Sequence, residues 1–178
     1  MKDYERKFWE DFCKVHKKLK EFYIRSEEHS KDFSTILQPI KEQKDALEHI
    51  VRVYCELLDG NEDEKYIAEN FSKAKGHIYR AYYDTADIFT IILRERISSH
   101  LSVFSHNQIS SVWGKEKYET ERNFLIDVNE SIAKLRIEKD VIDKSDVFNR
   151  YTEIIERLFN IYIDITKNIY PSLAAKYL

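Results

Sequence analysis

Glycine, proline and cysteine are scarce in this chain. Only 3 Gly and 2 Pro occur among 178 residues, and turn-rich or sheet-rich folds need these residues at their turns. The two cysteines, Cys13 and Cys55, are too few for a disulfide framework, and they predict free thiols in a reducing compartment. The scarcity therefore excludes the small disulfide-stabilised class and predicts an all-α chain with few turns.

Long apolar runs and an excess of one charge are also missing. The most apolar stretch, residues 88–93, is far too short to span a bilayer, and the charged start of the chain does not fit a signal peptide. The net charge of -3 gives no global field that would attract nucleic acid or an anionic membrane. We expect a cytoplasmic protein with no membrane partner, for which nucleic acid is possible but not favoured.

Hydrophobic and charged residues are abundant, at 43% and 34% of the chain, and the hydrophobic set includes 12 Tyr and 10 Phe. This composition suits long amphipathic helices with an aromatic core, and the length predicts a single domain over residues 1–178. The chain contains no glycine-rich nucleotide motif, no zinc-ligand spacing and no pair of Glu-x-x-His motifs. We therefore predict no cofactor and no metal site.

A heptad pattern runs from Phe8 to Leu57 and is the strongest signal in the sequence. Alternating steps of four and three residues place one stripe on one side of a helix, as in a coiled coil. The stripe contains Phe8, Phe12, Val15, Leu19, Phe22, Ser26, His29, Phe33, Ile36, Ile40, Gln43, Leu47, Ile50, Tyr54 and Leu57. Its phase is the same on both sides of Pro39, which fits one kinked helix or two nearly collinear helices, with a kink or short break between residues 31 and 39.

Further helices follow a turn at residues 58–64, where Gly60 suits a helix C-cap. The pattern predicts a second long helix over residues 63–104, a decay over residues 98–114, a third helix over residues 115–137 and a last helix from Ser145 or Asp146 that Pro171 ends. The predicted fold is an elongated antiparallel bundle of four to five helices, two of them unusually long.

The second long helix carries two adjacent apolar lines, so a large part of its circumference is apolar. Such a helix is normally central in its fold or covered by a partner chain. The residues assigned to a partner contact are Tyr79, Tyr82, Tyr83, Phe89 and Leu93. The leading hypothesis is a non-catalytic scaffold or adaptor that forms a homodimer or binds a larger protein.

A polar network is predicted between the first two long segments. His77, Arg80 and Asp84 share one face of the second long helix. If this helix pairs antiparallel with the segment before it, about residue 61, then Asp45 lies level with His77 and Glu42 lies level with Arg80. One interpretation is a buried network that fixes the helix register. The other is a pocket that holds a small anion or nucleotide, as in a sensor domain.

Arg94 and His100 form a second candidate site. Five residues separate them, and ribonucleases of the all-α HEPN class use an arginine followed after four to six residues by a histidine. His100 would act as general acid or base at a ribose hydroxyl, and Arg94 would stabilise the phosphate. On a continuous helix, six steps of about 100° place the two side chains on different faces. A metal-independent ribonuclease or RNA-binding module therefore requires a helix break or a second chain, and the spacing alone does not establish the class.

Overall fold

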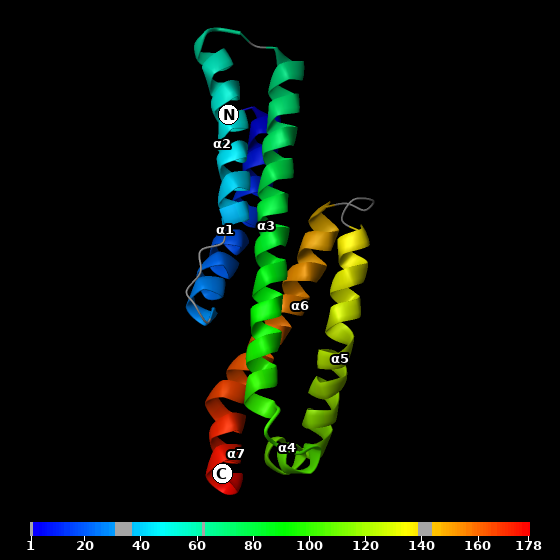
Figure 1. Cartoon of the computed structure of the whole chain (residues 1–178). Coiled ribbons are helices and arrows are strands. Elements are labelled where there is room, and N and C mark those ends of the chain that lie inside the picture. Colours follow the sequence, from blue (N-terminus) through cyan, green and yellow to red (C-terminus); the bar gives the residue numbers. More distant parts are fainter. Residues whose placement is uncertain (1, 31–36, 62, 139–143) are drawn as a thin grey trace. The chain divides into compact units, whose positions relative to one another are not determined.

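The computed structural model describes residues 2–30, 37–61, 63–138 and 144–178, and the regular structure within them is entirely helical (Figure 1). The helices are α1 (Asp3–His29), α2 (Leu37–Leu58), α3 (Glu64–Leu101), α4 (His106–Trp113), α5 (Lys115–Glu138), α6 (Lys144–Asp164), the π-helix η1 (Ile165–Ile169) and α7 (Tyr170–Tyr177). The all-α prediction is confirmed, and α3 has 38 residues, which corresponds to a length of about 57 Å. In the part of the chain described, no helix is long and apolar enough to cross a membrane.

Two compact units make up the chain, Met1–Phe89 and Thr90–Leu178. Helix α3 runs from the first unit into the second without interruption, so each unit contains a part of it. A single domain and an elongated antiparallel bundle are both statements about how the two units are arranged together. Both therefore stay predictions.

The predicted heptad stripe is buried along α1, in the first unit. The buried residues of this helix are Phe8, Val15, Leu19, Phe22 and Ser26. Phe8 stacks on Phe71 of α3 with 4.2 Å between ring centroids, and Phe22, further along α1, stacks on Tyr82, further along α3. The two helices therefore lie side by side and run in the same direction.

Helix α2 runs antiparallel to α1, and this corrects the prediction of one kinked helix or two collinear helices (Figure 1). Trp9, near the start of α1, donates a hydrogen bond from Nε1 to Tyr54 Oη near the end of α2, at 3.2 Å. Most of the predicted break lies in residues 31–36, outside the described residues. Pro39 lies in the first turn of α2, where the absence of an amide hydrogen leaves no intrahelical bond unmade.

The buried face of α2 shares only Ile50 with the predicted stripe. Its buried residues are Pro39, Glu42, Ala46, Ile50 and Val53, whereas Ile40, Leu47 and Tyr54 of the stripe are 43%, 58% and 37% exposed. The prediction of the stripe is therefore wrong for α2 at these three residues and holds at Ile50. The buried face of α2 packs against both neighbours, because Ile50 and Val53 share one core cluster with Phe8 of α1 and with Ile67, Phe71 and Ala74 of α3.

The turn between α2 and α3 follows the prediction. Gly60 has φ 80°, and its amide donates to the Leu57 carbonyl while the amide of Asn61 donates to the Glu56 carbonyl. These two bonds form a Schellman motif, in which glycine adopts the left-handed conformation without a steric penalty. Asp63 then caps α3, because its Oδ1 accepts from the amides of residues 65 and 66 at 3.0 and 3.2 Å.

In the second unit, the segment where the apolar pattern decays contains the short helix α4. Ser105 caps it through a capping box with Gln108, whose side chain accepts from the Ser105 amide at 2.8 Å. The Ser-x-x-Gln spacing is the signal that the sequence analysis missed. Gly114, with φ 85°, ends α4 before α5 begins at Lys115.

Pro171 does not end the last helix, contrary to the prediction. Between α6 and α7 the backbone forms the π-helix η1, in which the Tyr170 amide donates to the Ile165 carbonyl five residues earlier. Proline lacks an amide hydrogen and its ring crowds the preceding turn of an α-helix. The wider π-turn accommodates Pro171 at the start of α7, and the chain remains helical to Tyr177.

Candidate functional site

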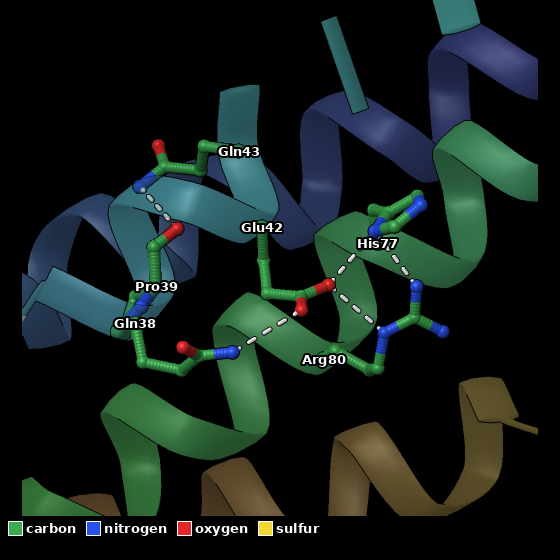
Figure 2. A network of polar contacts seen from close by, with 6 residues as sticks. All are labelled: Gln38, Pro39, Glu42, Gln43, His77 and Arg80. Carbon is green, nitrogen blue, oxygen red and sulfur yellow. Dashed lines mark hydrogen bonds and ion pairs between the residues drawn. The ribbon is translucent and has the colours of Figure 1, made fainter. Parts of the chain in front are cut away.

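A cluster of polar side chains lies between α2 and α3 in the first unit (Figure 2). Glu42 comes from α2, and His77 and Arg80 come from successive turns of α3. The antiparallel pairing of the two helices brings Glu42 level with both residues, close to the predicted register. Glu42 is only 9% exposed, and an ionised carboxylate so deeply buried requires charged or hydrogen-bonding partners.

The Glu42 carboxylate is the centre of this cluster. Its Oε2 accepts a hydrogen bond from Arg80 Nε at 2.9 Å and lies 2.8 Å from His77 Nδ1. Its Oε1 accepts from Gln38 Nε2 at 3.4 Å. Burial raises the pKa of the Glu42 carboxyl, but the hydrogen bonds and positive charge from Arg80 and His77 outweigh burial and hold that pKa below its ordinary value of 4.5. Glu42 is therefore ionised at neutral pH.

His77 Nδ1 has two contacts that a single nitrogen cannot satisfy together. It lies 2.8 Å from Glu42 Oε2, which can only accept, and 2.7 Å from Arg80 Nη2, which can only donate. With a proton on Nδ1, the imidazole donates to Glu42 and opposes Arg80; with a lone pair there, it accepts from Arg80 and opposes Glu42. The tautomer of His77 therefore decides which of the two contacts is a hydrogen bond.

Asp45 is the second acidic residue that α2 contributes to this cluster. One ligand atom from each of Glu42, Asp45 and His77 lies within 4.8 Å of the others. Asp45 is half-buried and makes no hydrogen bond or ion pair to the described part of the chain. Asp84 is also half-buried on α3, but among the residues described it does not belong to this group of closely spaced ligand atoms. Of the predicted network, the structure thus brings Glu42, Asp45, His77 and Arg80 together.

A second layer of the cluster was absent from the predicted network. His49 Nδ1 lies 2.9 Å from Asn70 Oδ1, and Asn70 Nδ2 donates to the Tyr66 carbonyl at 3.0 Å. Since the amide oxygen only accepts, Nδ1 of His49 carries the proton. The His49 ring stacks on that of His77 with 5.4 Å between centroids. His49 and Asn70 follow the same antiparallel register as Glu42 and His77, which is the signal that points to them.

The residues predicted to contact a partner lie in the core of the chain itself. Their exposed fractions are at most 4%, for Tyr79, Tyr82, Tyr83, Phe89 and Leu93. Tyr79 Oη donates to Asp11 Oδ1 of α1 at 2.9 Å, and burial raises the pKa of Tyr83. This finding corrects the location of the predicted surface: α3 is apolar on much of its circumference in the first unit because α1 and α2 both pack against it.

Arg94 and His100 do not converge within the chain. Helix α3 is continuous from Glu64 to Leu101, so the helix break that their convergence requires is absent from it. Arg94 lines a cavity of about 360 Å³ together with Leu125 and Asn129 of α5. His100 is not among the residues that line this cavity; its Nδ1 donates to the Arg96 carbonyl at 2.7 Å, and the edge of its ring meets Tyr170.

The arrangement between α2 and α3 thus combines two carboxylates, an imidazole and a guanidinium at the surface of one helix pair. The positive charge of Arg80 is already matched by Glu42, so an incoming anion would have to displace a carboxylate. Comparisons of the chain with protein-family models, with curated proteins and with solved structures gave no match.

Proposed function

We propose that this protein is a non-catalytic helical scaffold that self-associates through the outer face of α2. The observation that carries the proposal is a row of exposed apolar side chains along this helix. The row, called the α2 stripe here, consists of Leu37, Ile40, Leu47, Val51, Tyr54 and Leu58, which are between 37% and 86% exposed. Soluble monomers rarely expose a contiguous apolar surface of this kind unless it binds something.

The spacing of the α2 stripe is that of a coiled-coil seam. Leu37, Val51 and Leu58 occupy a positions and Ile40, Leu47 and Tyr54 occupy d positions of one heptad repeat, with Lys44 as the remaining a residue. None of these residues belongs to the buried set of α2. Apart from Tyr54, whose hydroxyl accepts a hydrogen bond from Trp9 of α1, the repeat is therefore left for another contact, and it fits a second helix that lies along α2.

A second copy of the chain fits this seam in the antiparallel orientation. A parallel pair would place Lys44 against the same lysine of its partner, in the seam, where like charges repel. In an antiparallel pair, a positions face d positions, and Lys44 lies opposite the partner's Leu47 instead. The same register brings Lys41, at an e position, beside the partner's Glu48, so that two symmetric ion pairs flank the seam. The charge pairing and the shared heptad spacing thus favour a second copy of the chain as the occupant of the α2 stripe.

Sedimentation equilibrium or light scattering tests the proposal. We expect a monomer–dimer equilibrium that is populated at about 100 µM or below. Leu47→Glu should weaken dimerisation at least about tenfold, because a carboxylate would have to be desolvated in the seam. The matched control is Ile126→Glu, since Ile126 on α5 is 58% exposed like Leu47 but lies outside the stripe.

The charge pair tests the orientation. Lys41→Glu alone should weaken the dimer, and the double exchange Lys41→Glu with Glu48→Lys should restore it. A wild-type chain that remains monomeric at about 100 µM would show that a second copy is not the occupant of the stripe. If Ile126→Glu and Leu47→Glu weakened dimerisation equally, α2 would not be the specific interface.

A further inference from the structure

The cluster between α2 and α3 contains the ligand types of a transition-metal site. One imidazole nitrogen and two carboxylate oxygens, from Glu42, Asp45 and His77, lie within 4.8 Å of one another. Separations of this size allow three atoms to bind one ion at the usual distances of about 2.0–2.2 Å after small side-chain rotations. An imidazole among the ligands favours zinc-class ions over magnesium or calcium, which prefer oxygen ligands alone.

The two contacts of His77 Nδ1 also fit a bound metal ion. Glu42 Oε2 and His77 Nδ1 are 2.8 Å apart, and each has a lone pair available when Glu42 is ionised and Nδ1 is unprotonated. In this state Arg80 is the cation that meets both atoms, since it donates to Oε2 through Nε and to Nδ1 through Nη2. A divalent cation is a partner that accepts both lone pairs at once.

Asp45 gives a second, independent observation. Its carboxylate is half-buried beside Glu42 and makes no hydrogen bond or ion pair with the residues described. With Glu42 ionised, the three charged side chains Glu42, Asp45 and Arg80 leave the cluster with one uncompensated negative charge when His77 is neutral. The site is therefore matched to a further positive charge and is not matched to an anion.

We propose that Glu42, Asp45 and His77 bind a divalent transition-metal ion of the zinc class, and that Arg80 is the internal cation which the metal displaces. The Arg80 side chain is 55% exposed, so it can move into water when the ion takes its place beside Glu42. A water molecule completes the coordination sphere. The ion links α2 to α3 and so stabilises the first unit, because an ion that binds only the folded state raises stability by mass action.

The test uses the full chain, freed of metal with a chelator, in a Cys13→Ser, Cys55→Ser background, because both thiols are exposed and would bind such ions themselves. Zn²⁺ is titrated by calorimetry, and Co²⁺ is titrated by visible absorption, which reports the ligand field. We expect one equivalent to bind, with a rise in melting temperature. Loss of an outer-shell partner alone usually weakens metal affinity by about 10–100-fold, so Asp45→Asn should weaken it at least about tenfold.

Three further variants make the outcome decisive. Arg80→Gln should raise the affinity severalfold, because the competing cation is removed, whereas a merely structural role of Arg80 predicts no increase. His77→Gln should abolish the Co²⁺ spectrum, and Asp45→Asn gives the same information if His77→Gln does not fold. His16→Gln, which changes an exposed histidine of α1, should have no effect. Absence of Zn²⁺ binding, or binding that Asp45→Asn and Arg80→Gln leave unchanged, would overturn the proposal.

Discussion

Replacing Tyr82 by alanine is expected to destabilise the protein by about 3–5 kcal/mol, as truncation of a fully buried aromatic side chain usually does. Tyr82 has no exposed surface, and its ring packs against Phe22 of α1, at 5.9 Å between centroids, and against Tyr83, at 5.3 Å. Alanine would leave a cavity where α1 and α3 meet. Thermal or urea unfolding followed by circular dichroism measures the loss, and we expect a fall in melting temperature on the order of 10 °C.

The same substitution separates a core residue from a partner contact. The control is Tyr4→Ala, because Tyr4 is 37% exposed and its ring lies 6.4 Å from Phe71; this change should have a much smaller effect. At temperatures where Tyr82→Ala is folded, its self-association should equal that of the wild type. If Tyr82→Ala instead left the unfolding free energy unchanged but abolished self-association, Tyr82 would be a partner contact, as the sequence analysis predicted.

The sequence predicts helices well here because periodicity reports which residues share a face. Along α1 the heptad residues Phe8, Val15 and Leu19 are buried as expected. Along α2 the same rule selects Leu47, which is exposed, and misses the fully buried Val53. Periodicity shows that a face is apolar but not which neighbour covers it. In α2 two apolar faces compete, and the reversal of the chain between α1 and α2 decides between them.

The candidate site was partly predictable for a related reason. An antiparallel pairing about the turn at Gly60 fixes which residues of α2 and α3 lie level, and this register alone brings Glu42 and Asp45 towards His77 and Arg80. What the register does not supply is the direction of each side chain. The double contact of His77 Nδ1, at 2.8 Å to Glu42 and 2.7 Å to Arg80, depends on the rotamers of all three side chains, and no sequence pattern encodes those.

Asp164→Ala is expected to destabilise the protein by about 1–3 kcal/mol, since it leaves a buried donor without its partner. Asp164 ends α6, and its Oδ2 accepts from Trp113 Nε1 at 3.0 Å and from Lys117 Nζ at 2.7 Å, while Oδ1 accepts from Asn168 Nδ2 at 2.8 Å. Trp113 is only 6% exposed, so its indole N–H has little access to water as a substitute. Chemical unfolding at neutral pH measures the loss.

The pH dependence of the unfolding free energy separates the contribution of the Asp164 charge from that of its hydrogen-bond acceptor. Burial raises the pKa of this carboxyl, but hydrogen bonds from Asn168, Lys117 and Trp113 outweigh burial and hold the pKa below its ordinary value of 3.8. The unfolded state therefore binds the proton more readily, so the carboxylate stabilises the folded state above pH 3.8 and this contribution disappears as the pH falls through the lowered value.

Asp164→Asn retains one oxygen acceptor for Trp113 but has no group that titrates. Its unfolding free energy should therefore lie below that of the wild type at neutral pH and approach it as the medium becomes more acidic than pH 3.8. A constant difference between the two proteins across this range would mean that the charge of Asp164 does not contribute. In that case the effect of Asp164→Ala would be due to the lost acceptor alone, and the tie between α4 and α6 would be a neutral hydrogen bond.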